Sequence, residues 1–258
     1  MVSRAILVTG ANRVIVCADR KPYKRSLVYP EYKQIRAKSS DPDIAEDAKI
    51  SQSMVVQALQ ALRIPIWEAA GYEADDLAGV LVRKHHHRFD QIISMSGDGD
   101  LFQLLDTENY SIFAGAAVGA RRAGKSAPPD VIHTPRSFAA SYGGMTSAQF
   151  VEYLALQGTH NDVAGIYGVG PAKAKAAVLG GGETGTAREL YLANRGLIDR
   201  NKALIVLPMP GFPADQFPLP DRTNVDVRAL VRFCDQYDID VTSDMELAFT
   251  QCNRRSTR

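Results

Sequence analysis

The sequence contains few cysteines and no long apolar segment, and these absences exclude several classes of protein. Its three cysteines, Cys17, Cys234 and Cys252, show no CxxC spacing, which argues against a disulfide framework or a zinc site and indicates reduced thiols. No apolar run approaches the roughly 20 residues that a membrane-spanning helix needs. The N-terminus has a short apolar run and no small-residue cleavage site, which is not typical of a signal peptide. We therefore expect a cytoplasmic protein with no membrane partner.

The net charge is also small, at +1, but positive charge gathers in one stretch near the N-terminus. Within residues 21–38, lysines and arginines are interleaved with Tyr23, Tyr29 and Tyr32. The basic residues of this stretch are Lys21, Lys24, Arg25, Lys33, Arg36 and Lys38. Such a run is either a solvated face or a surface for phosphates, because alternating cations and aromatic rings suit nucleic acid.

Apolar patterns in the first 105 residues predict short strands that alternate with helices. Strands are expected at 14–17, 64–67 and 91–95, and helices at 1–9, at 53–62 and from residue 72 onward. This order is typical of an α/β fold with a mainly parallel central sheet flanked by helices. The polar segment 37–48 predicts a loop.

Beyond residue 105 the pattern changes from alternating elements to helices. The segments 110–118 and 130–133 predict a β-hairpin. Thr146 and Gln149 have the spacing of a capping box ahead of the apolar run FVEYLAL, which predicts a helix start. We therefore expect two domains, which are an α/β core over residues 1–135 and a helical subdomain over residues 136–258.

Carboxylates occur in three groups at places where a strand ends or a helix begins. The groups are Asp19, then Glu73, Asp75 and Asp76, and then Asp98 and Asp100. Because functional groups collect at the carboxyl ends of parallel strands, we expect these groups to converge. Carboxylates so close repel one another, and divalent cations such as Mg²⁺ would offset that repulsion. Each motif alone has a simpler interpretation, since first-turn acids complement a helix dipole and GDGD is a common turn.

The same motifs, taken in order, resemble a known family. GYEADD followed about twenty residues later by SGDGDLFQLL is similar to the 5′-nuclease or flap endonuclease family, which includes phage 5′-exonucleases and the 5′-nuclease domain of bacterial DNA polymerase I. VIVCADRKPYKRSLVYPEYKQIR resembles the strand and aspartate segment of that family, and GIYGVGPAKAKA resembles its helix–hairpin–helix. The similarity extends over about residues 1–180 and implies a PIN-like 5′-nuclease core followed by a helical helix–hairpin–helix subdomain.

The resemblance also implies roles for individual residues. Asp19, Glu73 and Asp75 take the positions of ligands to a first divalent ion, and Asp76, Asp98, Asp100 and Asp162 take those that complete the shell and a second site. The ions would be Mg²⁺ or Mn²⁺. Lys33 stands at the position of an active-site lysine, and Arg25 at that of an arginine that steers a phosphate. Residues 37–50 occupy the position of the arch that threads or clamps single-stranded 5′ ends.

A second set of residues is expected to bind DNA. In the glycine-rich segment, Gly165, Gly168 and Gly170 permit conformations and close approaches that a Cβ would obstruct. Amides at the following helix start, with Lys173 and Lys175, can face a phosphate, and the family often holds a monovalent cation such as K⁺ there. Lys21, Lys24 and Arg36 belong to the same expected DNA surface. As a bare pattern, GxxGxG could equally be a helix-packing turn.

The sequence departs from the family pattern at two places. Only eighteen residues precede Asp19 and none is acidic, so the family's first strand and its aspartate are missing. The segment GTHNDV places Thr159 where the family has an aspartate, with Asn161 and Asp162 as partial replacements. Either the recorded start is too late or the chain is a degenerate member with reduced catalysis.

These observations predict a divalent-metal-dependent 5′-3′ exonuclease or structure-specific flap endonuclease. Its partner would be DNA with 5′ ends, flaps or branches, with RNA–DNA hybrids as a further candidate, and we expect a monomer in a bacterial or phage-infected cell. The alternative is a catalytically weak or inactive member of the same family that binds branched DNA. A dehydrogenase, suggested by ILVTGANR, is disfavoured because Arg13 and the residues after it replace the later glycines of a dinucleotide fingerprint.

Overall fold

The computed structural model describes residues 2–33, 42–115, 130–159, 163–180, 185–219 and 225–253. The chain forms two compact units, each built from segments that are distant in the sequence. Unit 1 comprises Met1–Ala18, Ser40–Glu68 and Asp215–Arg258, and unit 2 comprises Asp19–Ser39 and Ala69–Ala214. Within the described ranges, no helix combines the length and the apolar character needed to span a bilayer.

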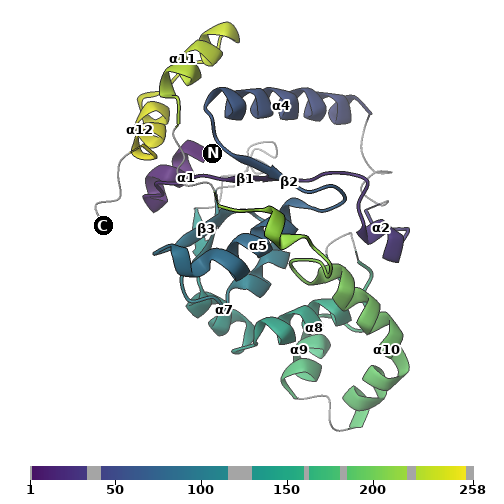
Figure 1. Ribbon diagram of the computed structural model, residues 1–258. Coiled ribbons are helices and arrows are strands. Elements are labelled where there is room, and N and C mark those ends of the chain that lie inside the picture. The colour runs from purple at the N-terminus through teal and green to yellow at the C-terminus, as the bar shows by residue number, and fades with distance from the viewer. Residues whose placement is uncertain are drawn as a thin grey trace. The chain divides into compact units, whose positions relative to one another are not determined.

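Unit 1 contains a small parallel sheet and helices that pack in pairs. Its strands are β1 (Val16–Ala18) and β2 (Ile66–Glu68), which lie side by side with Val16 opposite Ile66 (Figure 1). Its helices are α1 (Val2–Thr9), α4 (Pro42–Ala61), α11 (Val227–Gln236) and α12 (Ser243–Gln251). α1 packs on α12 and α4 on α11, and their apolar faces bury a core that includes Ile6, Leu59 and Phe249.

The single tryptophan of the chain belongs to this unit. Trp67 lies at the centre of β2 and is 9% exposed, whereas the next residue, Glu68, is exposed. This alternation is what a strand with one covered face requires, because successive side chains point to opposite sides. The Trp67 ring packs against Phe217, with 5.6 Å between ring centroids.

Unit 2 contains a second sheet and further helices. Its strands are β3 (Ile92–Met95), β4 (Tyr110–Ala114) and β5 (Val131–His133), in the order β3-β4-β5. Its α-helices are α2 (Arg25–Val28), α5 (Ala74–His85), α7 (Pro135–Tyr142), α8 (Ser147–Gln157), α9 (Pro171–Leu179) and α10 (Gly185–Ile205). The 3-10 helices are η1 (His86–Arg88), η2 (Gly99–Leu104) and, at the boundary of the two units in the sequence, η3 (Ala214–Gln216).

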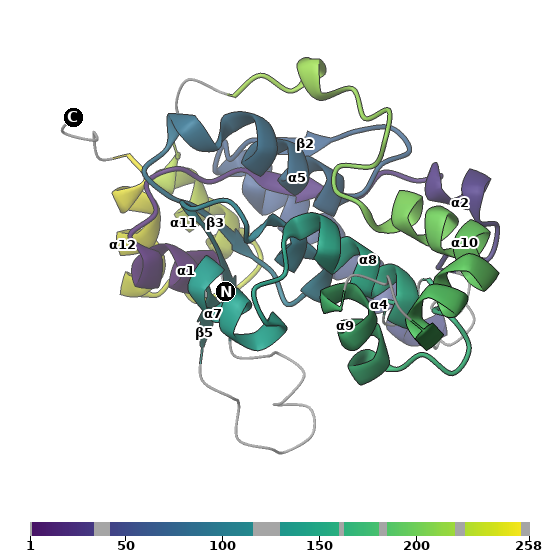
Figure 2. The same cartoon turned by 90° about the horizontal axis from the view of Figure 1, so that it is seen from below.

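The core of unit 2 lies between β4 and the later helices. Tyr110 and Ile112 of β4 are 1% exposed and belong to one apolar cluster with Phe150 of α8 and Leu204 of α10. α8, α9 and α10 lie side by side in both views (Figures 1 and 2), and α8 packs against each of the other two. α8 is therefore the central helix of this group.

Two local predictions from the sequence are confirmed. The Thr146 hydroxyl accepts a hydrogen bond from the Gln149 amide at 3.2 Å, and the Gln149 side chain accepts one from the Thr146 amide at 2.9 Å, so a capping box begins α8. The strands β4 and β5 pair antiparallel, with Ile112 opposite His133, as the predicted hairpin requires. Both signals depend on residues near one another in the sequence.

Three features of the architecture differ from the sequence prediction. Backbone hydrogen bonds join the described strands into two small sheets, not one central sheet, because the strands are only three to five residues long and form few ladder bonds. The loop predicted over 37–48 is wrong from Pro42 onward, where α4 begins. The predicted boundary at 135 does not separate the units, because Leu104 before it and Phe150 after it share one core.

Candidate active site at the start of α5

The first turn of α5 organises the acidic residues. Glu73 is the N-cap residue, and its backbone amide donates to the Asp76 carboxylate at 3.1 Å. Asp75 and Asp76 lie in the first turn, where negative charge complements the positive end of the helix dipole. The simpler interpretation of these acids is thus partly correct, since one of them satisfies an amide that the helix leaves open.

Backbone hydrogen bonds bring Asp19 to this helix start. The amide of Arg20 donates to the Tyr72 carbonyl at 3.0 Å, and the amide of Gly71 donates to the Arg20 carbonyl at 2.9 Å. The Ala74 amide then donates to Asp19 Oδ1 at 2.8 Å, and the Tyr23 hydroxyl donates to Asp19 Oδ2 at 2.8 Å. Asp19, which directly follows β1, is therefore fixed against the first turn of α5.

Asp98 and Asp100 follow β3 and begin η2. The Asp100 amide donates to Asp98 Oδ1 at 2.9 Å, so Asp98 caps this short helix. Gly97 and Gly99 have no neighbouring atoms within reach of an added Cβ, so this turn is not crowded. The GDGD stretch thus forms the cap and first residues of η2, and it also places two carboxylates near Asp75 of α5.

Asp75 shows that these groups converge. Burial raises the pKa of Asp75 to about 7, and the nearby charges of Asp98, Glu73, Asp100 and Asp19 act in the same direction. In the part of the chain that the structure describes, the Asp75 carboxylate accepts no hydrogen bond and forms no ion pair. Among the same residues no three carboxylates close into a complete metal-binding group. Asp19, Glu73, Asp75, Asp98 and Asp100 thus form a carboxylate patch whose members repel one another, and their side chains are not arranged as a ready-made chelate.

Arg25 and Asp76 are placed differently from what the resemblance implied. Arg25 is 2% exposed and Asp76 is fully buried, and the two form a bidentate pair with N–O distances of 2.6 and 2.7 Å. Asp76 also accepts hydrogen bonds from the amides of Glu73 and Met209, and Arg25 Nε donates to the Leu204 carbonyl at 2.7 Å. Because both side chains are enclosed and engaged, this geometry argues against Asp76 as a metal ligand and Arg25 as a phosphate contact.

The environment of Arg25 favours its charged form. Burial alone would lower the pKa of the guanidinium, but the hydrogen bond and charge of Asp76, with the charge of Glu73, outweigh burial and raise that pKa. The Glu73 carboxylate lies 2.8 Å from Arg25 Nη1. A buried cation thus holds Glu73 from the inner side of the site.

Lys33 and Tyr32 hold Glu73 from the outer side. The Lys33 ammonium forms an ion pair with Glu73 and lies 3.7 Å from Asp19 Oδ2, and the Tyr32 hydroxyl donates to Glu73 Oε2 at 2.8 Å. Lys33 has a φ of 58°, a left-handed conformation that is uncommon for a long side chain and clusters at functional sites. This places the predicted active-site lysine among the acids, with its side chain 21% exposed.

The other predicted cations of this stretch lie nearby or outside the described residues. Lys24 Nζ donates to the Tyr72 hydroxyl at 3.0 Å, and Lys21 is exposed with its Nζ 5.8 Å from the centre of the Tyr23 ring. Arg36 and Asp162 fall outside the described residues, so their predicted roles stay predictions.

The glycine-rich segment forms a tight connection between α8 and α9. A Cβ on Gly165 would lie 2.2 Å from the carbonyl carbon of Gln157, so only glycine fits there, and Gly168 has a φ of 75°. Tyr167 at the tip is fully exposed. Gly170 is the N-cap of α9, which leaves the first amides of that helix without a side-chain partner. Lys173 Nζ donates to the Gly168 carbonyl at 3.1 Å, and Lys175 Nζ donates to the Ser141 carbonyl at 3.0 Å.

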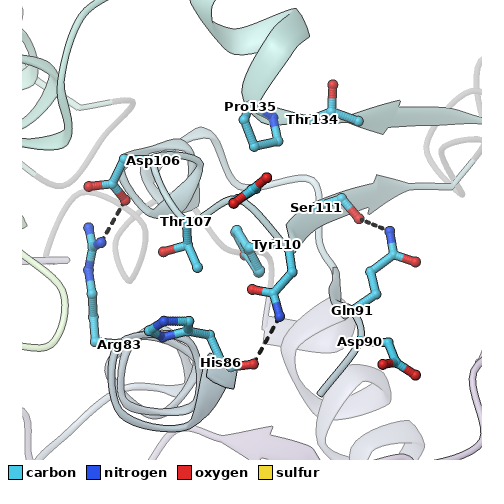
Figure 3. Close-up of a pocket in the computed structure, with 12 residues that line it drawn as sticks. Arg83, His86, Asp90, Gln91, Asp106, Thr107, Tyr110, Ser111, Thr134 and Pro135 are labelled. Atoms are coloured by element: carbon cyan, nitrogen blue, oxygen red, sulfur yellow. Dashed lines mark hydrogen bonds and ion pairs between the residues drawn. The ribbon is translucent and has the colours of Figure 1, made fainter. Parts of the chain in front are cut away.

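A pocket of about 950 Å³ lies elsewhere in unit 2, beside the starts of β3 and β4 (Figure 3). Arg83 pairs there with Asp106 at 2.6 Å, and Gln91 donates to the Ser111 hydroxyl at 3.2 Å. Asp98 and Asp100 follow the opposite end of β3, and none of the predicted site residues lines this pocket. The candidate site is therefore the carboxylate patch at the start of α5.

With this geometry established, similarity to known proteins decides the family. Residues 1–141, more than half of the chain, match the family described as 5′-3′ exonuclease, N-terminal resolvase-like domain. The chain is a member of this 5′-3′ exonuclease family. The resemblance inferred from the sequence motifs is thereby confirmed.

Relatives of this 5′-3′ exonuclease family member include both free exonucleases and polymerases. The chain is 31% identical over 152 residues to the 5′-3′ exonuclease of Aquifex aeolicus, covering 58% of this chain and 46% of that protein. It is 29% identical over 168 residues to the thermostable DNA polymerase I of Thermus filiformis, covering 65% of this chain and 18% of the polymerase. The chain thus matches about half or less of the length of these relatives.

A solved structure shows that the family member also shares a known fold. The bacteriophage T5 D15 protein, co-crystallised with metal ions, superposes with a TM-score of 0.66 at 21% identity, covering 91% of this chain and 88% of that chain. At this level of identity the likeness concerns the fold alone. The predicted α/β class is confirmed, although the described strands form two small sheets in place of the one mainly parallel central sheet that was predicted.

Sequence reasoning named the residues that hold the carboxylates in place but did not predict this role for them. The Arg25–Asp76 pair joins residues 51 positions apart, and the hydroxyls of Tyr23 and Tyr32 donate to Asp19 and Glu73. The only local signal for Asp76 was its position three residues after Glu73, the spacing of a capping box. For Arg25 the sequence carries no such signal, since nothing near it marks it as buried.

Proposed function

We propose that the protein is a divalent-metal-dependent 5′-3′ exonuclease and structure-specific flap endonuclease that hydrolyses phosphodiester bonds in DNA, with RNA–DNA hybrids as a further substrate. The observation that carries the proposal is the convergence of four carboxylates on Asp75 in a chain of the 5′-3′ exonuclease family. Acids gathered this closely in a half-buried site repel one another, and bound divalent cations would offset that repulsion. The metal ions crystallised with the T5 D15 protein point the same way.

The donor set fits Mg²⁺ or Mn²⁺, because all of its members are carboxylates and hard cations prefer oxygen. We assign Asp19, Glu73, Asp75, Asp98 and Asp100 to two ions, with Asp162 as a sixth candidate. Asp76 is left out, because the Arg25 guanidinium and the amides of Glu73 and Met209 engage its oxygens. When bound, the ions would lower the pKa of the attacking water and neutralise the leaving oxygen.

The chain's own groups would position the substrate and the acids. Tyr32 and Arg25 fix the Glu73 carboxylate, so its orientation does not depend on a ligand. The Lys33 ammonium, next to Glu73 and Asp19, provides positive charge where a scissile phosphate would carry developing negative charge. Lys21 and Lys24, which are both exposed, would add positive charge for further phosphates of the bound DNA strand.

The glycine hairpin would hold duplex DNA as a helix–hairpin–helix. Gly165, Gly168 and Gly170 permit backbone conformations and close approaches that a Cβ would obstruct, and the amides at the start of α9, which no N-cap side chain engages, would donate to a phosphate. Lys173 and Lys175 add charge, and a K⁺ ion held by carbonyls of the hairpin would complete the grip. Because such contacts go to the phosphate backbone, binding should be independent of sequence and sensitive to salt.

Asp75→Asn tests the proposed metal site. The substitution removes a charge that the other ligands surround, so we expect Mg²⁺-dependent cleavage of a 5′-flap substrate to fall by about 100-fold or more. The matched control is Asp199→Asn, which neutralises an exposed aspartate of α10 outside the proposed machinery. Cleavage by Asp75→Asn at the wild-type rate would remove the proposed site.

A second candidate function is recognition of branched DNA with little or no cleavage. It is favoured by the geometry of Glu73, which the structure ties to Arg25, Tyr32 and Lys33, and by the carboxylates of the described residues not closing into a metal-binding group. Flap cleavage in Mg²⁺ or Mn²⁺ above that of a variant lacking Asp19, Asp75 and Asp98 would exclude it. Tight binding without such cleavage would establish it in place of the nuclease.

A further inference from the structure

A polar side chain at the C-terminal end of α10 is enclosed in the core of unit 2. Asn201 is fully buried, and its Nδ2 donates to two carbonyls, those of Ala155 and Ala164, each at 2.9 Å. Its Oδ1 accepts from Arg200 Nε at 3.1 Å and from Arg200 Nη2 at 2.8 Å. Every hydrogen-bonding atom of the amide is thus engaged, as burial of a polar group requires.

The two carbonyls lie on either side of the loop that leads into the glycine hairpin. Ala155 belongs to α8, and Ala164 forms an isolated antiparallel bridge with Gly158 at the base of that loop. The next bond of the hairpin, from the Ile166 amide to the Leu156 carbonyl at 2.8 Å, continues this bridge toward the tip. Asn201 therefore clamps the base of the hairpin to the end of α8.

Arg200 fixes the orientation of the Asn201 amide. Its guanidinium carbon lies 4.5 Å from the centre of the Tyr29 ring, and a guanidinium stacked on an aromatic face has few alternative positions. With the cation held on the Oδ1 side, the Nδ2 group is left to face the two carbonyls. Tyr29, which holds Arg200, belongs to the same segment as Lys33, and both lie in unit 2 with Asn201.

We propose that Asn201 is a positioning residue that holds the glycine hairpin in its DNA-binding geometry, and that it determines affinity for DNA without taking part in cleavage. This inference rests on the proposed function, because it assigns the hairpin to DNA. An apolar residue of similar size would fill the same volume, so packing alone does not require an amide. The two hydrogen bonds of the Asn201 amide fix the distance between α8 and the base of the hairpin. They thereby also fix the base relative to the amides at the start of α9, which the hairpin leads into.

The test compares Asn201→Leu with Asn194→Leu. Asn194 lies on the same helix, and among the described residues its side chain donates to the carbonyl of Leu190, four residues earlier, and not to the hairpin, so its loss should leave the hairpin base intact. For each protein we would measure the Kd for a 5′-flap DNA in chelator, and KM and kcat for its cleavage in Mg²⁺. In Asn201→Leu we expect Kd and KM to rise about tenfold with kcat within about twofold of wild type, whereas Asn194→Leu should match wild type.

Asn201→Ser keeps the proposal testable should the leucine variant fold poorly. A serine hydroxyl can donate to one of the two carbonyls, so an intermediate Kd is expected. A folded Asn201→Leu or Asn201→Ser with wild-type Kd would overturn the proposal, and so would a fall in kcat at unchanged KM. Loss of the fold in both variants would also overturn it, since Asn201 would then serve stability alone. Failure of the wild type to bind DNA or to cleave it would instead count against the proposed function.

Discussion

Neighbouring residues of α5 have opposite electrostatic surroundings. Asp76 is fully buried, yet Arg25 and two backbone amides satisfy its carboxylate. Asp75, one position earlier, is half-buried, and burial together with the charges of four nearby acids raises its pKa. Asp76 therefore serves the fold, whereas the Asp75 carboxylate is available to a ligand.

The raised pKa of Asp75 predicts that the metal-free protein loses stability as the pH rises from about 4 to about 7. In that window the folded state binds more protons at Asp75 than the unfolded chain does, so its contribution is favourable on the acidic side and is lost above pH 7. In Asp75→Asn this contribution is removed. Urea unfolding midpoints in chelator, measured between about pH 5 and pH 8, should fall less steeply for the variant than for wild type. Parallel curves would contradict the shift.

At the scale of elements, the Arg25–Asp76 pair connects three segments. Arg25 begins α2, Asp76 lies in the first turn of α5, and the pair also binds the Leu204 carbonyl and the Met209 amide at and after the end of α10. These hydrogen bonds hold together the segments that carry Lys33 and Glu73. The Arg25–Asp76 pair thus fixes the backbone segments that position the carboxylate patch.

Breaking this pair on one side should be more harmful than removing both charges. Arg25→Met leaves Asp76 charged and enclosed, and loss of one partner of a buried ion pair costs about 3–5 kcal/mol. The double variant Arg25→Met/Asp76→Leu removes both charges of the pair, and Glu73 keeps its ion pair with Lys33, so we expect part of that loss to be recovered. Urea unfolding at neutral pH measures both values, and a double variant less stable than the single one would contradict this account.

The sequence predicted local elements better than the contacts that assemble them. The start of α8 was found because Thr146 and Gln149 are three residues apart, so the capping signal is contained in one turn. The start of α4 was missed although Pro42 occupies a first-turn position that proline favours, because the surrounding residues are polar and suggested a loop. The Arg25–Asp76 pair and the Asn201 clamp depend on tertiary packing, and no spacing of residues along the sequence predicts them.

At the scale of the whole molecule, all described candidate residues belong to unit 2. Asp19, Lys33, the acids of α5 and the glycine hairpin fall within Asp19–Ser39 and Ala69–Ala214. Unit 1 has its own apolar core, to which the helices near both ends of the chain contribute. The family match over residues 1–141 includes parts of both units, so membership of the family does not depend on the site alone.

Binding of Mg²⁺ to the carboxylate patch should stabilise the folded chain. A ligand that binds only the folded state adds about 2.7 kcal/mol at a concentration of 100 Kd, which corresponds to a rise in Tm of roughly 5–10 °C for a protein of this size. Differential scanning calorimetry with increasing Mg²⁺ measures this shift. Asp75→Asn should show a much smaller shift, and Asp199→Asn the wild-type one. Equal shifts in all three proteins would indicate that Mg²⁺ binds elsewhere.

The location of Trp67 determines what an optical experiment on this protein reports. The chain's single indole lies in β2 of unit 1, against Phe217, and none of the candidate residues shares that unit. Its fluorescence therefore follows the melting of unit 1, whereas far-ultraviolet circular dichroism follows the helices of both. If the two signals change at different denaturant concentrations, the units melt as separate cooperative bodies, and a single free energy cannot describe the chain.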